Sequence, residues 1–326
     1  MRSDYSGELD RLVTAEDPSL QFLARRDLAR EDPTTSAMRR LQARIRTSAR
    51  VSALLEGHAR GGASTYGKWK GAHWVVLHLA FLAHPGGDPR VEALVDETLA
   101  YWTAPRFLRD EEMGSVVRSP QFVPVIAGKA RRCASQQGGA LLAAVALGHH
   151  DDTRVTVLAD RLADWQWPDG GWNCDRRVEA RMSSVNETFL PLRGLLALGD
   201  REDTADRACE FLLDRHVIYR RTDGQPLHPV VAQLHHPAYW HYDLLAGLTA
   251  LADGRRLGDA RCTRALDLLE SLRLEEGGWP AHAKWYKVAD SGSNIDSVGW
   301  GATGAAKPND WVTLDALRVL AHAGRI

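Results

Sequence analysis

The sequence predicts an all-α protein folded as an α/α toroid of about six helical hairpins, with an inner ring of helices inside an outer ring. Apolar residues recur at spacings of three and four, without long alternation of period two, which indicates helices. Helices that are apolar on nearly every face alternate with helices that carry one narrow apolar stripe, and the former are typical of buried positions. An open α-solenoid is the alternative, although its repeats are usually shorter and more regular.

The composition excludes several classes of protein. The 326 residues are 44% hydrophobic and 25% charged, and 41 basic against 42 acidic side chains argue against a dedicated nucleic-acid-binding protein. The longest apolar stretch, 74–82, is too short to span a membrane. The first twelve residues contain no apolar signal core, and four cysteines are too few for a disulfide scaffold. We therefore expect a cytoplasmic protein.

The elements follow one another in a regular order. Residues 1–60 form N-terminal helices, near 18–30 and 34–56, and residues 61–326 form the hairpins, all within a single domain 1–326. The expected inner helices are nearly apolar and cover 71–83, 135–148, 186–199, 241–252 and 309–321. The expected outer helices cover 90–102, 153–167, 204–215 and 260–272. The turns that lead into the outer helices carry acids, which favour a helix N-terminus and are predicted to cap it: Asp88, Asp151 and Asp152, Asp203, and Asp259.

Two phrases of the sequence carry a family resemblance, DWQWPDGGWNCD (164–175) and LEEGGWPAHAKW (274–285). Each places Gly-Gly-Trp after an outer helix, which resembles the QW repeats of squalene–hopene and oxidosqualene cyclases and also extends to protein prenyltransferase β-subunits. The resemblance implies an α/α toroid with a central apolar cavity. In these loops we expect the glycines to make a tight turn and Trp172 and Trp279 to pack on the next hairpin.

The toroid topology predicts where a site would lie. All loops that lead from an outer into an inner helix share one end of such a fold, and they hold the unusual residues. A carboxylate at the mouth of an apolar cavity has a raised pKa and can act as a general acid, so the candidates for catalysis are Glu187, Asp243 and Asp310, together with His241. Polar and aromatic residues near the same helix starts are the candidates for substrate binding: His73, Trp74, Gln136, Gln137, Trp240 and Trp311.

The same loops suggest a metal site. Thiolate, imidazole and carboxylate side chains are zinc ligands, and the candidates are Cys133, Cys174, Asp175, His236 and His241. Protein prenyltransferase β-subunits, which the chain resembles, carry an Asp-x-Cys and a distant His at inner-helix starts. His241 falls in a comparable region, whereas Asn186-Glu187-Thr188 stands where the Asp-x-Cys is expected. Zinc is therefore a candidate cofactor, and each acid has capping as its alternative role.

Two functions follow from these observations. The resemblance implies an enzyme of terpene cyclase or prenyltransferase type, whose partner is a hydrophobic small molecule of isoprenoid class held among Trp74, Trp240 and Trp311. The alternative is a non-catalytic module that binds a lipid, a peptide or a protein partner in the same mouth. A divalent metal or a carboxylate with a strongly shifted pKa would favour the enzyme.

Overall fold

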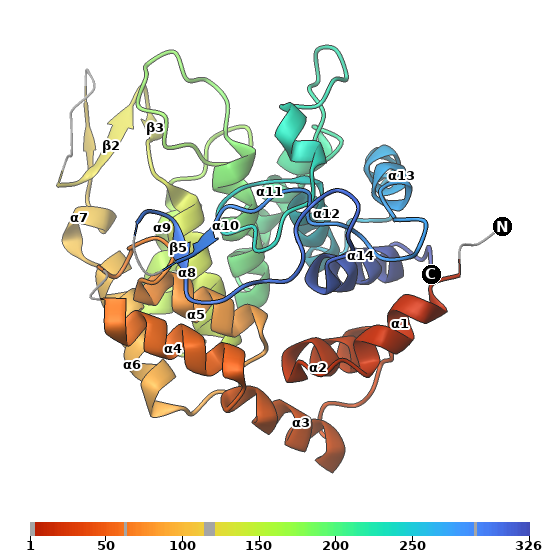
Figure 1. Cartoon of the computed structure of the whole chain (residues 1–326). Coiled ribbons are helices and arrows are strands. Elements are labelled where there is room, and N and C mark those ends of the chain that lie inside the picture. The colour runs from red at the N-terminus through yellow and green to blue at the C-terminus, as the bar shows by residue number, and fades with distance from the viewer. Residues whose placement is uncertain (1–3, 62–63, 114–120, 290–291) are drawn as a thin grey trace.

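The computed structural model describes residues 4–61, 64–113, 121–289 and 292–326, and these residues are mostly helical (Figure 1). The all-α class expected from the apolar spacing is therefore confirmed. None of the described helices combines the length and apolar character that crossing a membrane requires.

The N-terminal part consists of α1 (Ser6–Val13), α2 (Pro18–Asp27), α3 (Ser36–Arg46) and α4 (Ala49–Gly61). The single helix predicted over 34–56 is therefore two helices. The first ends at Arg46, with Thr47 as its C-cap residue. The Ser48 hydroxyl then accepts a hydrogen bond from the Val51 amide at 3.3 Å and caps a new helix start. The sequence prediction missed this break because arginines and alanines favour helix on both sides of it.

The nearly apolar segments form α5 (Ala72–Phe81), α8 (Ala134–Ala146), α10 (Val185–Leu198), α12 (Leu244–Asp253) and α14 (Asp310–His322). Four of them start within one residue of the prediction. The exception is α12, which starts three residues later than predicted. The Asp243 carboxylate accepts a hydrogen bond from the Ala246 amide at 2.8 Å and fixes the helix start there. In Figure 1, α5, α8 and α10 stand next to one another, and α12 lies beside α14.

The amphipathic segments form α6 (Pro89–Trp102), α9 (Thr153–Asp164), α11 (Glu202–Leu213) and the pair η2 (Ala260–Cys262) and α13 (Thr263–Ser271). Asp88, Asp152 and Asp259 each accept a backbone hydrogen bond two residues ahead and cap their helices, as predicted. The prediction for Asp203 is wrong. The N-cap of α11 is Arg201, in a left-handed conformation, so Asp203 lies inside the first turn.

Short elements lie between the hairpins. They are α7 (Pro105–Leu108), η1 (Pro229–Ala232), β1 (Asp110–Glu112), β2 (Val123–Ile126), β3 (Lys129–Ala130), β4 (Lys287–Val288) and β5 (Ile295–Asp296). Strand β2 pairs in parallel with β1 and antiparallel with β3, and β4 pairs in parallel with β5. The sequence analysis predicted none of these strands, because two to four residues are too few for a period of two to be visible.

Side-chain contacts bring the N-terminal ends of the five apolar helices together. Helix α5 contacts α8, α8 contacts α10, α10 contacts α12, and α12 contacts α14. Between the starts of α5 and α8, Gln136 donates to the Tyr66 hydroxyl at 2.7 Å, and between those of α8 and α10 the Ser135 hydroxyl donates to Glu187 at 2.8 Å. Between the starts of α10 and α12, the Tyr242 amide donates to Asn186 at 2.7 Å. At the start of α14, the ring of Trp311 stacks on that of His236, from the loop before α12, with 5.4 Å between centroids. The expected convergence of these helix starts at one end therefore holds.

The two Gly-Gly-Trp loops have the same local structure. The indole N–H of Trp172 donates to the carbonyl of Leu162 at 2.8 Å, and that of Trp279 donates to the carbonyl of Leu269 at 2.7 Å, so each Trp binds the preceding outer helix. Both indoles are 1% exposed or less. The loops are tight because Gly170 and Gly277 adopt φ values of 93° and 90°, which only glycine adopts without strain.

The same loops also hold the following apolar helix. The Thr188 hydroxyl of α10 accepts a hydrogen bond from the Trp172 amide at 3.3 Å, and the Thr313 hydroxyl of α14 accepts one from the Trp279 amide at 3.0 Å. Each Gly-Gly-Trp loop therefore ties an outer helix to the next inner helix through equivalent atoms. The expectation that the tryptophans pack on the next hairpin is therefore met only by their backbone amides, because the indole N–H groups bind the preceding outer helix.

Candidate functional site

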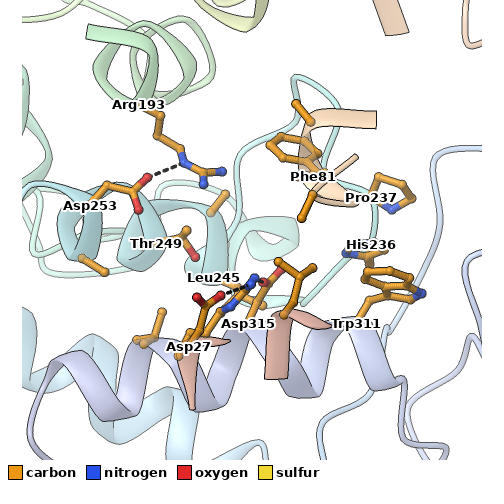
Figure 2. A pocket seen from close by; sticks show the side chains of 18 of the residues that line it. Asp27, Phe81, Arg193, His236, Pro237, Leu245, Thr249, Asp253, Trp311 and Asp315 are labelled. Carbon is orange, nitrogen blue, oxygen red and sulfur yellow. Dashed lines mark hydrogen bonds and ion pairs between the residues drawn. The ribbon is translucent and has the colours of Figure 1, made fainter. Parts of the chain in front are cut away.

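A cavity of about 550 Å³ lies among the apolar helices. Its lining comes mainly from α2, α5, α10, α12 and α14 and from the loops before α12 and α14. Cavities of this size are typical of small-molecule sites. The lining divides into an aromatic end and a charged end, and the charged end reaches the surface at Asp253, which is exposed. Figure 2 shows His236 and Trp311 on one side of the cavity and Arg193 and Asp253 on the other, with Asp27 and Asp315 between them.

The aromatic end is built from the loops that close the cavity near the helix starts. Tyr239 and Trp300 are each 1% exposed, and His236 stacks on Trp311. Burial lowers the pKa of His236 well below its usual value, so the imidazole is neutral at physiological pH. The aromatic end therefore offers ring faces without a positive charge on its histidine.

His78 adds an unusual polar group to the aromatic end. It lies on α5, is 1% exposed and lines the cavity, and both of its ring nitrogens are buried without a hydrogen-bond partner. Burial also lowers the pKa of His78, which favours the neutral ring. A buried polar group without a partner among the described residues is costly. Both nitrogens are closed off from the cavity, because the rings of Tyr239 and Trp300 pack against His78.

The charged end holds two groups of ion pairs. Arg193 of α10 donates from Nε to Asp253 of α12 at 2.6 Å. Arg318 of α14 donates both to Asp315, one turn earlier on the same helix at 3.0 Å, and to Asp27 of α2. The second group therefore places two carboxylates around one guanidinium, inside a cavity (Figure 2).

The two carboxylates around Arg318 differ in acidity. Burial raises the pKa of Asp315, and this effect outweighs the nearby charges of Arg318 and Arg193. Burial also acts on Asp27, but the charges and hydrogen bonds of Arg318 and Arg26 outweigh it and lower the pKa of Asp27. Environments that separate the pKa values of two neighbouring acids are typical of acid–base sites. Asp315 is therefore the weaker acid of this group and Asp27 the stronger one.

Three of the residues predicted for the site line the cavity: Asp243, His236 and Trp311. Asp243 caps α12 and also accepts a hydrogen bond from the His235 amide at 2.9 Å, so its carboxylate is held by the backbone. Asp310, which was predicted as a catalytic acid, forms a half-exposed ion pair with Arg11 at 3.1 Å and does not line the cavity.

The other residues predicted to bind substrate also lie outside the cavity lining. His73 accepts a hydrogen bond from the Trp102 indole at 3.0 Å, and burial lowers its pKa to about 3. The Trp74 indole donates to a backbone carbonyl in the loop before α5. Gln137 accepts a hydrogen bond from Arg132 at 2.6 Å. The partners of the remaining two are Tyr66 for Gln136 and the stacked His241 ring for Trp240.

The predicted metal ligands separate into two sets. Cys133 and Cys174 come together with Glu187, a residue predicted as a catalytic acid, and one ligand atom of each lies within 4.8 Å of the others. His241 instead stacks on the rings of Trp240 and Trp285, each at 4.0 Å, where burial lowers its pKa to about 4.

The two remaining metal candidates also make other contacts. Asp175 forms an ion pair with Arg177 at 2.5 Å, and its carboxylate caps the Arg177 amide. His236 lies in the aromatic end of the cavity. The cluster of Cys133, Cys174 and Glu187 therefore contains neither of these residues.

Sequence reasoning missed the charged residues of the cavity. Arg193 stands in the otherwise apolar stretch NETFLPLRGLLALG, and Asp315 and Arg318 interrupt NDWVTLDALRVLA. A charge on a helix that is buried on most faces is a signal that could have found them, because such a charge needs a buried partner or a polar cavity. Asp27 gave no such signal, since it ends an amphipathic helix with other charges beside it.

Comparison of the chain with models of known protein families, with curated proteins and with solved structures found no match.

Proposed function

We propose that the chain folds as a closed α/α toroid and acts as an enzyme of terpene cyclase or prenyltransferase type on an amphiphilic small molecule in the cavity. Contacts between neighbouring helices support a closed ring. The series of contacts that runs from α5 to α14 continues from α14 to α2. It then passes from α2 to α3, from α3 to α4 and from α4 back to α5. The two equivalent Gly-Gly-Trp loops support the same arrangement.

The division of the cavity favours an amphiphilic substrate over a purely apolar one. An apolar chain, such as an isoprenoid chain, fits against Tyr239, Trp300 and Trp311, and a polar head group fits beside the ion pair of Arg193 and Asp253. Asp315 and Asp27 then lie between these two parts (Figure 2). A cavity lined by apolar rings with a few convergent polar groups is the usual form of a small-molecule site.

The observation that carries the proposal is the pair of Asp315 and Asp27 on Arg318. Asp315 would donate its proton to a carbon–carbon double bond of the substrate, which leaves a carboxylate on Asp315 and a carbocation on the substrate. The ring of Tyr239, which lines the cavity, would attract this cation. Trp300 and Trp311 already hold the Arg50 guanidinium, whose carbon lies 5.0 Å and 5.3 Å from their ring centroids.

The test is turnover of isoprenoid substrates. We would incubate the purified chain with linear isoprenoid alcohols, their diphosphates and long polyene hydrocarbons, and analyse the products by gas chromatography with mass spectrometry. We expect Asp315→Asn, which keeps the size of the side chain, to lower turnover by about 10²–10⁴-fold. The matched control is Asp206→Asn, which removes an exposed ion pair with Arg256 on an outer helix.

The pH dependence gives a second readout. Because the protonated form of Asp315 is the acid, turnover should fall as the pH rises through its raised pKa. Binding of these compounds in the cavity without any product would favour the non-catalytic module instead. Equal turnover by the wild-type chain and Asp315→Asn would refute the role of Asp315.

A further inference from the structure

A second site lies outside the cavity, where Cys133, Cys174 and Glu187 meet. Cys133 is the N-cap residue of α8, Cys174 follows the Gly-Gly-Trp loop, and Glu187 lies in the first turn of α10. One sulfur from each cysteine and a carboxylate oxygen lie within 4.8 Å of one another. None of the three side chains lines the cavity, so the cluster has no part in the function proposed above.

The backbone holds the three ligand-bearing segments together. Arg131 and Asn173 form a parallel β-bridge, and the Arg132 amide donates to the Asn173 carbonyl at 3.1 Å, which places the residues that follow, Cys133 and Cys174, side by side. Trp172 and Ser184 form an antiparallel bridge, which carries the same loop to the start of α10. The cluster is therefore part of a folded framework and does not depend on a chance approach of surface side chains.

The carboxylate of Glu187 has a fixed orientation. Its Oε2 atom accepts hydrogen bonds from the Ser135 amide at 3.0 Å and the Ser135 hydroxyl at 2.8 Å. Its Oε1 atom accepts a hydrogen bond from the Cys174 thiol at 3.3 Å. Partners that hold a ligand in place without touching the metal are typical of metal sites, and Ser135 has this position.

The ligands of the cluster would carry a negative charge that favours binding of a cation. Glu187 is 7% exposed and accepts three hydrogen bonds. With a metal bound, two thiolates and a carboxylate would carry three negative charges, which a divalent cation together with the nearby Arg132 guanidinium would balance.

From this geometry we infer that Cys133, Cys174 and Glu187 bind one Zn²⁺ ion through three protein ligands. Thiolate ligands favour zinc over magnesium and calcium, which take oxygen ligands. Ligand atoms on one tetrahedral zinc, at Zn–S near ~2.3 Å and Zn–O near ~2.1 Å, lie roughly 3.5 Å apart, so a shift of about 1 Å closes the cluster. Cys133 and Cys174 are half-buried, which leaves the fourth position open to water or another ligand.

The ligand set differs from the one expected from the sequence. The expected set combined the two cysteines with Asp175, His236 and His241, but these three residues have the other partners described above. Glu187 takes their place because α10 begins beside α8, so the first turn of α10 faces the N-cap residue of α8. The inferred site therefore consists of two sulfurs and one oxygen, without a histidine.

The experiment measures zinc on the full chain, purified under reducing conditions without an affinity tag. We expect close to one equivalent of Zn²⁺ per chain, and Co²⁺ loaded in its place should show a thiolate-to-cobalt charge-transfer band. Competition with a chromophoric chelator gives the affinity. Ser135→Ala should weaken Zn²⁺ binding by about 10–100-fold, as the loss of an outer partner usually does, and Cys133→Ser or Cys174→Ser should weaken it more.

The matched control is Cys209→Ser. This cysteine is buried on α11, away from the cluster, so its loss should leave Zn²⁺ binding unchanged. If the ligand variants fail to fold, alkylation of the wild-type chain replaces them: Zn²⁺ should protect Cys133 and Cys174 from a thiol reagent, with peptides identified by mass spectrometry. This readout needs no substitution and no activity.

Two results would overturn the inference. One is binding of less than about a tenth of an equivalent of Zn²⁺ by the reduced wild-type chain at neutral pH, where ligand thiols release their protons to the metal. The other is a Cys133–Cys174 disulfide that, after its reduction, gives a dithiol without affinity for Zn²⁺. In either case the cluster is not a metal site, and the function proposed for the cavity is unaffected.

Discussion

The contact between α8 and α10 makes a sharp prediction about two adjacent glycines. A Cβ atom added at Gly138 would lie 2.3 Å from the backbone nitrogen of Pro191 and 2.5 Å from its Cα, so only a hydrogen atom fits there. A Cβ atom added at the next residue, Gly139, would meet nothing closer than 3.5 Å, which is ordinary van der Waals contact. The same chemical change at neighbouring positions should therefore have opposite effects.

The magnitude follows from the atoms involved. At Gly138 the clash is with backbone, so the helices must separate, and we expect Gly138→Ala to lower the free energy of unfolding by about 3 kcal/mol or more. Gly139→Ala should raise it by up to about 1 kcal/mol, because alanine favours helix over glycine. With an unfolding entropy of roughly 2.1 cal/mol/K per residue over the chain, these values correspond to about 4 °C down and about 1.5 °C up in Tm.

The assay is thermal and urea unfolding of the wild-type chain and both variants, followed by far-ultraviolet circular dichroism. Equal Tm values for Gly138→Ala and Gly139→Ala would refute the reasoning, because the two substitutions differ only in what the new methyl group meets. A Tm that falls for Gly139→Ala but not for Gly138→Ala would mean that the close contact lies at Gly139, contrary to the prediction.

Three further predictions concern stability. Trp172→Ala and Trp279→Ala should each cost about 3–5 kcal/mol in urea unfolding without altering a ligand's affinity for the cavity, and loss of affinity at unchanged Tm would contradict their packing role. Asp152→Ala removes a helix cap and should lower the free energy of unfolding by about 1 kcal/mol. Asp203→Ala should lower it by less, because only a favourable charge in the first helical turn is lost. Comparison of the urea midpoints of the two variants tests this difference. Since burial raises the folded pKa of Asp315, the wild-type chain should lose stability relative to Asp315→Asn as the pH rises from about 4 through that pKa, and parallel Tm curves from pH 3 to 8 would contradict this.

The extent to which the site could be predicted differs between its parts. The sequence indicated that Cys133, Cys174 and Glu187 lie near inner-helix starts, and the structure places them together. It gave the wrong partners to His241, which stacks on its neighbour Trp240 and on Trp285. The contact with Trp285 comes from a separate loop, and such a contact leaves no pattern in the sequence. The sequence also directed attention to Asp310, whereas Asp315 is the acid of that helix that lines the cavity.

The sequence by itself determined the features that depend on local periodicity and on turn chemistry. The alternation of apolar and amphipathic helices, the capping by Asp88, Asp152 and Asp259 and the tight glycine turns of the two Gly-Gly-Trp loops follow from residues close together in the chain. Helical spacing and hydrogen bonds to nearby amides act over a few residues, so they are visible in a single sequence.

Only the tertiary structure decided which polar groups meet. Arg318 reaches Asp27 across 291 positions of the chain, and Ser135 reaches Glu187 across 52. The identity of such partners depends on how each helix is rotated about its axis and how closely its neighbours approach, which packing sets over the whole core. The pKa difference between Asp27 and Asp315, and the juxtaposition of two thiols with a buried carboxylate, arise at that level.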